Sequence, residues 1–222
     1  MARVSSPQLA DSPRDRLIAA GVRLLRSDGP GALQARRVCA EVGVSTMAVY
    51  THFGGMTGLL EAIVAESFAR FGEALAAVPA TDDPMADFFV MGYAYRRFAL
   101  DDPHRYRLMF RLDLPQTCAD QEAGLPVAAA TFNQLVTALQ RIIDTGRIRA
   151  DDPVDLAGRM WSMVHGIALL EIVGNFESDG STVTRIMGPM TQDIFVGMGD
   201  DRARVDESMH RARAAIALNA AR

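Results

Sequence analysis

The chain has 222 residues, 49% of them hydrophobic and 23% charged, and a net charge of −4. These values are typical of a soluble globular protein with one large domain, or a small domain plus a larger one. No stretch is long and apolar enough to span a bilayer, and no apolar run after Arg3 could be a signal peptide, so we expect neither a membrane-spanning nor a secreted protein.

The overall charge does not suggest a nucleic-acid binder, but its distribution does. Up to Thr57 the chain carries seven arginines against four carboxylates, so the remainder holds all of the excess negative charge. A basic N-terminal segment followed by an acidic remainder is typical of a protein that binds DNA through one domain only. Chance segregation of a few charges is the alternative explanation.

The first predicted helix begins at Pro13, because Ser12 can cap it and proline suits the first helical position. The run Gly29–Pro30–Gly31 ends this helix. Residues 1–11 have little periodicity, and we expect them to form a mobile arm.

The stretch from Gln34 to Phe53 predicts two short helices joined by a tight turn. Apolar residues form a helical stripe that Gly43 ends, and Ser45 is placed to cap a second helix running from Thr46 to His52. A small residue at Cys39, the turn glycine and an aliphatic residue at Val49 have the spacing of a helix-turn-helix.

The outward side chains of this pair of helices are the candidate DNA-binding residues. Hydroxyl groups and arginines can bind phosphate, whereas Met47 and Thr51 can touch base edges, including the thymine methyl group. The alternative is a helical hairpin whose polar face is only solvated. The candidates are Gln34, Arg36, Arg37, Ser45, Thr46, Met47, Tyr50, Thr51 and His52.

The run VSTMAVYTHF, which ends at Phe53, closely resembles the recognition helix of TetR-type transcriptional regulators, and the resemblance extends over residues 11–60. The run DPHRYRLMF from Asp102, and Trp161 with His165 and Gly166, resemble the C-terminal domain of the subgroup named for Trp, His and Gly. The resemblance implies a dimeric regulator, most often a repressor, whose body binds a small-molecule inducer.

Helical periodicity continues through the rest of the chain, with Asp-Pro pairs marking three helix starts. No alternating strand pattern is present, so we predict an all-α fold. A three-helix DNA-binding domain would span residues 1–57, and a helical ligand-binding and dimerisation domain residues 58–222. The later helices are expected at 56–78, 84–100, 103–112, 127–145, 153–175, 182–198 and 201–220, with a long loop at 113–124.

Aromatic and methionine side chains recur at helical spacing in the body. They can be ordinary core, or they can line a ligand pocket with adaptable walls. His165 is either a hydrogen-bonded histidine of the core or a side chain that hydrogen-bonds a ligand. Gly166, in the middle of a predicted helix, predicts a close crossing with another helix. The pocket candidates are Met91, Tyr95, Phe98, Tyr106, Phe110, Phe132, Trp161 and His165.

The segment after residue 182 carries a nearly continuous apolar stripe, which predicts a homodimer interface. Its members are Val183, Ile186, Met187, Met190, Ile194 and Met198.

The sequence contains no phosphate-binding glycine loop, no metalloprotease motif, no nucleophile elbow and no Cys-x-x-Cys pair, which argues against an enzyme. We therefore expect no cofactor and no metal. The expected partners are double-stranded operator DNA, an unidentified small-molecule effector and a second copy of the chain, in the cytoplasm. Cys39 lies on a buried stripe, so a disulfide with Cys118 is not expected. A protein-binding helical adaptor and a helical enzyme without DNA function are the alternatives.

Overall fold

The computed structural model describes residues 12–112 and 126–220, and these form helices without any strand, which confirms the all-α prediction. The helices are α1 (Pro13–Asp28), η1 (Pro30–Ala32), α2 (Ala35–Val42), α3 (Met47–Phe53), α4 (Met56–Ala76), α5 (Pro84–Asp101), α6 (Pro103–Met109), α7 (Pro126–Asp144), α8 (Pro153–Ile172), η3 (Val183–Met187), α9 (Gly188–Gly197) and α10 (Arg202–Ala220). The arm expected at residues 1–11, the loop expected at 113–124 and Cys118 lie outside the described residues.

Local sequence signals fix most of the helix starts. The Ser12 hydroxyl accepts a hydrogen bond from the Asp15 amide at 3.1 Å, and Asp83 and Asp152 cap α5 and α8 in the same way. Some ends differ from the prediction. Helix α6 stops at Met109, three residues early, and Arg111 just beyond it has a positive φ of 54°.

The single helix expected at residues 182–198 is divided into two parts. Residues 181 and 182 are α-helical, Val183–Met187 form a turn of wider π-helix, and the α-helix α9 follows from Gly188. Pro189 lies in the first turn of α9 and has no N–H, so it cannot close the α-helical bond to the carbonyl four residues before it. The proline therefore accounts for the break.

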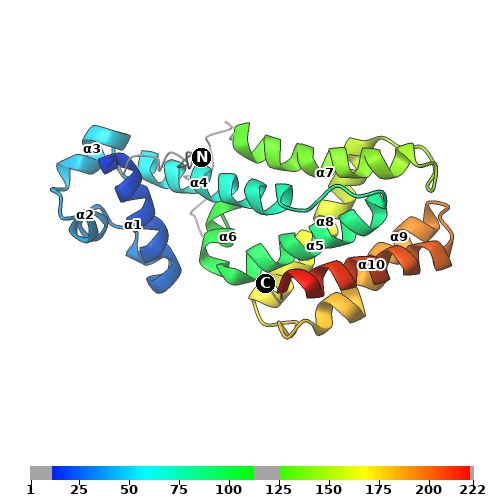
Figure 1. Cartoon of the computed structure of the whole chain (residues 1–222). Coiled ribbons are helices and arrows are strands. Elements are labelled where there is room, and N and C mark those ends of the chain that lie inside the picture. Colours follow the sequence, from blue (N-terminus) through cyan, green and yellow to red (C-terminus); the bar gives the residue numbers. More distant parts are fainter. Residues whose placement is uncertain (1–11, 113–125, 221–222) are drawn as a thin grey trace, which may run out of the picture. The chain divides into compact units, whose positions relative to one another are not determined.

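The chain divides into two compact units, and the boundary between them falls within α4. Unit 1 comprises residues 1–67 and 104–121, and Figure 1 shows its helices α1, α2 and α3 as a small group. Its core is apolar and includes the fully buried side chains of Leu17, Leu25, Val38 and Val49. The division into domains at Thr57 stays a prediction.

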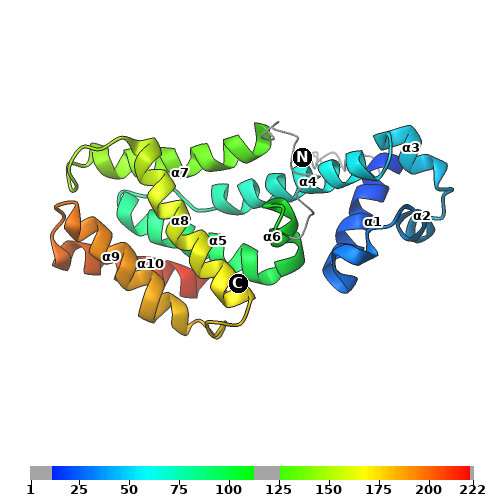
Figure 2. The same cartoon turned by 180° about the vertical axis from the view of Figure 1, so that it is seen from behind.

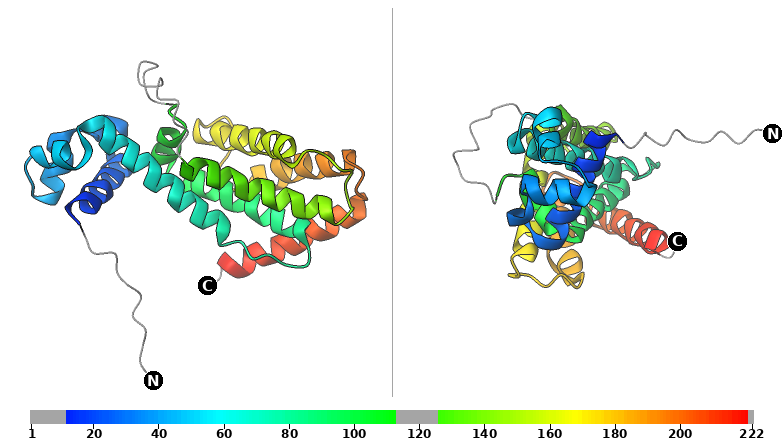
Figure 3. Two further views of the ribbon diagram at one scale, coloured as in Figure 1. Left: turned by 90° about the horizontal axis from the view of Figure 1, so that it is seen from above. Right: turned by 90° about the vertical axis from the view of Figure 1, so that its left-hand side faces the viewer.

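Unit 2 comprises residues 68–103 and 122–222 and is a helical bundle. Helix α5 contacts α7, α8 and α10, α7 also packs on α8, and α10 also packs on α9. Figures 2 and 3 show this bundle from behind, from above and from one side. Its core includes Met85, Leu139, Leu156, Met160 and Phe195.

A buried ion pair joins α5 to α8 inside unit 2. The Arg96 guanidinium donates to both carboxylate oxygens of Glu171, over 2.7 Å from Nε and 2.6 Å from Nη2. The two side chains are only 7% and 0% exposed. This two-bond geometry satisfies both charges in a low-dielectric site and fixes how the two helices face each other.

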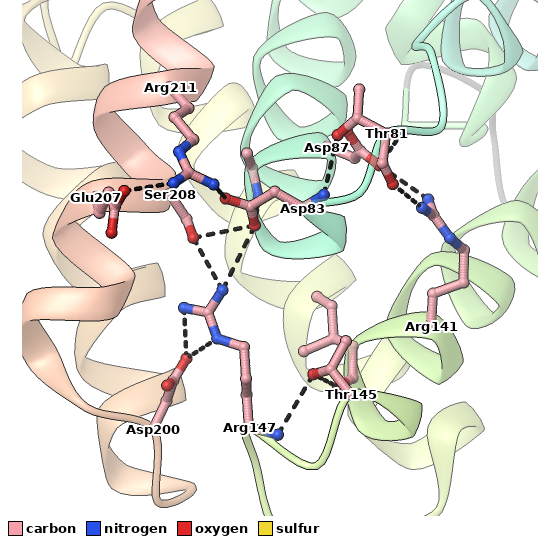
Figure 4. A network of polar contacts seen from close by, with 12 residues as sticks. Thr81, Asp83, Asp87, Arg141, Thr145, Arg147, Asp200, Glu207, Ser208 and Arg211 are labelled. Atoms are coloured by element: carbon pink, nitrogen blue, oxygen red, sulfur yellow. Dashed lines mark hydrogen bonds and ion pairs between the residues drawn. The ribbon is translucent and has the colours of Figure 1, made fainter.

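A second polar network ties the end of α7 and the start of α10 to the start of α5 (Figure 4). Arg147 donates to Asp200 at 2.9 Å and to Ser208 at 2.9 Å, and Ser208 donates to Asp83 at 3.0 Å. Asp83 also accepts from Arg211 at 3.1 Å. The carboxylate that caps α5 therefore also holds the C-terminal helix.

Candidate nucleic-acid interface

Helix α3 is anchored by one buried side chain and presents the others outward. Val49 is fully buried, whereas Met47 is 64% and Tyr50 is 59% exposed. Met47 and Tyr50 are thus two large exposed side chains on a helix of only seven residues. Helix α3 contacts α1 and α2, which hold it in place from its inner side.

A glycine turn sets the angle between α2 and α3. Gly43 lies in the left-handed region, with φ 73° and ψ 34°, and ends α2. The Val44 amide then donates to the carbonyl of Cys39 at 3.0 Å, which closes the turn. This backbone conformation favours glycine, as the sequence predicted.

The prediction that Ser45 caps α3 is wrong. The capping position belongs to Thr46, which already has helical angles, φ −59° and ψ −23°. A cap usually needs an extended backbone to turn its hydroxyl toward the helix amides. Within the described residues neither hydroxyl makes a capping bond, and both side chains remain exposed at the start of α3.

Helix α2 carries two exposed arginines, of which one forms an ion pair within the chain and the other does not pair with any described residue. Arg37 forms an ion pair with Asp28 at the end of α1, and both side chains are about half exposed. Arg36 is exposed and has no ion pair with any described residue. The side-chain amide of Gln34 donates to the carbonyl of Gly31 at 3.2 Å. Arg36 is therefore the arginine of α2 that is available to a phosphate or a base.

All nine candidate DNA-binding residues are exposed and come from one short segment of unit 1, on α2, α3 and the turn between them. Sequence reasoning missed Asp28 as the partner of Arg37, since the two are nine residues apart on different helices. It also did not predict the cation–π contact of Arg14, whose guanidinium lies 5.3 Å from the centre of the Phe53 ring and links α1 to the end of α3.

Three of the predicted pocket residues form a hydrogen-bonded chain between α5 and α8. The Trp161 indole N–H donates to the Tyr95 hydroxyl at 3.1 Å, and that hydroxyl lies 3.2 Å from Nδ1 of His165. Because an indole can only donate, the Tyr95 oxygen accepts from Trp161. The Tyr95 hydroxyl and Nδ1 of His165 share a second hydrogen bond, whose donor is set by the tautomer of the histidine. Burial lowers the pKa of His165, which favours the neutral ring.

Aromatic rings surround this chain. Phe132 lies 6.2 Å from Trp161, and Phe71, which the sequence analysis did not select, lies 4.9 Å from Tyr95 and 4.8 Å from Phe98 between ring centres. Met91 packs against the main core of unit 2. Five of the eight predicted pocket residues are thus brought into one aromatic group.

Two predicted pocket residues belong elsewhere. Tyr106 and Phe110 lie at α6 in unit 1, with ring centres 4.9 Å apart, and Tyr106 is fully buried. The sequence analysis placed them in the body because they follow α5 directly, whereas α6 falls in unit 1, which also holds α1 to α3 and the first part of α4. Unit 2 by itself therefore does not bring these two rings to Tyr95 and His165.

A shallow apolar hollow of about 260 Å³ lies between α4 and α7 in unit 2. It is lined by Phe68, Gly72, Ala76, Val127, Thr131 and Gln134, among others. None of these was predicted as a pocket residue. They had no distinguishing sequence pattern, since small residues on two helices form a hollow only when those helices pack together.

The predicted dimer stripe is partly wrong. Met187 and Met198 are only 7% and 3% exposed, so the fold of a single chain already buries them. Ile194 packs against the core of unit 2, whereas Met190 is 44% exposed. Gly166 also does not mark a close helix crossing within the described residues, because a Cβ atom there would meet no atom within 4 Å.

Helices α1, α2 and α3, with a glycine turn before α3 and the side chains of α3 pointing outward, form a helix-turn-helix unit of the kind that binds the major groove of DNA. The family model "Bacterial regulatory proteins, tetR family" matches residues 17–63, and the model "Tetracyclin repressor-like, C-terminal domain" matches residues 88–194. Together they cover more than half of the chain, which belongs to the TetR family of transcriptional regulators. The Trp-His-Gly subgroup stays a prediction.

Individual relatives are distant. The chain is 24% identical over 144 residues to the HTH-type transcriptional regulator Rv1816 of Mycobacterium tuberculosis, a match that spans 63% of this chain and 61% of that regulator. A protein of unknown function from Rhodococcus sp. RHA1 has a similar structure, with a TM-score of 0.72, 26% identity and coverage of 88% of this chain and 100% of that one. RolR, solved with resorcinol, has the same fold at a TM-score of 0.63 and 18% identity, with coverage of 89% and 92%.

Proposed function

We propose that this protein is a sequence-specific, DNA-binding transcriptional regulator that acts as a repressor and is released from its operator by a small molecule. The observation that carries the proposal is α3, which is held by Val49 and presents Met47 and Tyr50 outward beside an available Arg36. In this proposal residues 1–57 bind DNA, residues 58–222 bind the ligand and the second subunit, and the protein works in the cytoplasm.

The test of DNA binding is an electrophoretic mobility shift with the DNA upstream of the protein's own gene, at moderate salt and with excess competitor DNA. A regulator retains a specific complex under these conditions, because base contacts add to the phosphate contacts that salt weakens. An adaptor or an enzyme without DNA function would give no complex. Binding to every DNA alike, lost as salt rises, would also contradict the proposal.

We propose that the ligand binds in unit 2 beside the chain of Trp161, Tyr95 and His165. An aromatic group with a few polar atoms is the usual composition of a small-molecule site, and it supports this location. RolR, which shares the fold, was solved with resorcinol, although a likeness at 18% identity carries the fold alone. The test is to denature protein purified from its native host and identify any released ligand by mass spectrometry. A ligand whose binding survives Tyr95→Phe and His165→Ala unchanged would contradict this location.

We propose that the functional state is a homodimer that pairs through α8 and α9. Val154, Leu170, Val173 and Met190 are exposed apolar side chains on or next to these helices, and Gly166 has open space beside it. A two-fold dimer would place two copies of α3 in successive turns of the major groove, about 34 Å apart. Analytical ultracentrifugation should find a dimer that Leu170→Glu dissociates. A native monomer at micromolar concentration would contradict the proposal.

None of the helices in the described part of the chain combines the length and apolar character that crossing a membrane requires. Within the same residues, no three His, Cys, Asp or Glu side chains gather closely enough to hold a metal ion.

A further inference from the structure

The outward face of α3 lacks every side chain that reads a base by paired hydrogen bonds. Arginine and lysine read guanine, asparagine and glutamine read adenine, and carboxylates read cytosine. Helix α3 has the sequence MAVYTHF and contains none of these. Its two most exposed large side chains are Met47 and Tyr50.

The remaining polar groups near α3 are partly engaged within the chain. The Thr51 hydroxyl donates its proton to the carbonyl of Met47 at 2.9 Å, so it has no proton for a base. The exposed Thr51 side chain therefore offers its methyl group and an accepting oxygen. The phenol of Tyr50, at the tip of a long exposed side chain, is suited to a backbone phosphate.

Helix α2 does not replace the missing base-reading groups. The carboxamide of Gln34 donates to Gly31, and the guanidinium of Arg37 is held by Asp28. Arg36 remains available, but one arginine for each subunit specifies at most one guanine in a half-site. Ser45, Thr46 and His52 are exposed, but a hydroxyl or an imidazole specifies a base less strictly than a two-bond contact does. Much of the sequence information in a half-site must then come from contacts that are not hydrogen bonds.

In the major groove the one apolar group that distinguishes a base is the C5 methyl of thymine. We infer that this protein recognises its DNA chiefly through thymine methyl groups, which contact the thioether of Met47 and the methyl of Thr51, while its hydrogen bonds go to phosphates. This inference rests on the proposed DNA-binding function and deepens it by naming the chemistry that is read.

The test uses a duplex that the full-length protein selects from a random library. Each thymine of the protected half-sites is replaced in turn by deoxyuridine, which pairs with adenine identically but lacks the methyl group. Removing one buried methyl should weaken binding about fourfold at each contacted thymine. Deoxyuridine in the flanking sequence should change the affinity by less than twofold.

Two variants assign the contacts to residues. Thr51→Ser keeps the hydroxyl and its bond to the backbone but removes the methyl, and Met47→Ala removes the thioether from an exposed helical position. Each variant should bind the thymine and uracil duplexes equally at the position that its side chain touches. Leu218→Ala, at an exposed apolar residue of α10 that belongs to neither proposed interface, is the control and should keep the native preference.

Failure of the inference differs from failure of the proposed function. If no duplex is enriched in the selection, the protein does not bind DNA specifically, and both fail. If a duplex is enriched and every uracil substitution in the half-sites leaves binding unchanged, only the methyl readout is overturned. The same conclusion follows if Met47→Ala and Thr51→Ser keep the full preference for thymine.

Discussion

The buried pair of Arg96 and Glu171 allows a quantitative test of how unit 2 is held together. Replacing Glu171 by glutamine keeps the shape of the side chain but removes the charge that compensates Arg96. Because the two side chains are 7% and 0% exposed, water cannot replace the lost carboxylate without opening the contact between α5 and α8.

The expected cost is about 3–5 kcal/mol of unfolding free energy, since breaking a buried ion pair leaves an uncompensated charge in a low-dielectric site. For a protein of this size such a loss lowers the melting temperature by about 10 °C. Trp161 is the only tryptophan of the chain and lies in unit 2, so its fluorescence reports unfolding of this unit directly.

The double variant Arg96→Met with Glu171→Leu is the control. Replacing both charges by apolar groups of similar size should restore most of the lost stability, because the penalty comes from the unpaired charge. A loss below about 1 kcal/mol for Glu171→Gln would contradict the buried geometry. A double variant as unstable as the single one would show that packing, and not charge, is responsible.

Three further predictions concern single positions. A Cβ atom at Gly58 would lie 2.0 Å from the carbonyl oxygen of Phe53 at the end of α3, so Gly58→Ala should lower stability by about 1–3 kcal/mol and weaken DNA binding. Gly31→Ala, where a Cβ atom meets no described atom within 4 Å, is the control and should leave both the melting temperature and DNA binding unchanged. Asp28→Asn frees Arg37 for a phosphate, so the slope of log K against log salt concentration should steepen by about 0.9 for each added contact. An unchanged slope would show that Arg37 does not contact DNA. Burial lowers the pKa of His165 below its ordinary value near 6.5, so the unfolded chain takes up the proton more readily and stability falls as the pH drops below about 6.5. Between pH 8 and 5.5 the melting temperature should therefore change less with pH in His165→Gln than in the native protein. An identical pH dependence of the melting temperature in the two proteins would contradict this.

Helices α2 and α3 could be predicted in detail because their signals are local. Gly43, Val49 and the exposed residues around them lie within one short segment, where a helical period and one turn glycine decide which side chains point inward. Asp83 and Asp152 marked the starts of α5 and α8 for the same reason, since a cap and its amides are neighbours in the chain.

The features that the sequence analysis missed depend on which helices pack together. The pair of Arg96 and Glu171 joins positions 75 residues apart, and nothing in the periodicity of either helix indicates the other. The stripe that includes Met187 and Met198 was identified correctly as apolar, but its periodicity could not show that the chain itself buries these two side chains. An apolar face predicts burial and does not name the element that buries it.

The central claim, that α3 contacts DNA, is tested most directly by placing a photoreactive amino acid at position 50 in place of Tyr50 and irradiating the complex with the selected duplex. A covalent adduct should form from position 50, and none from position 218 in place of Leu218, which is also exposed but lies in unit 2. Equal yields at the two positions, or no adduct from position 50 while the duplex remains bound, would contradict the account.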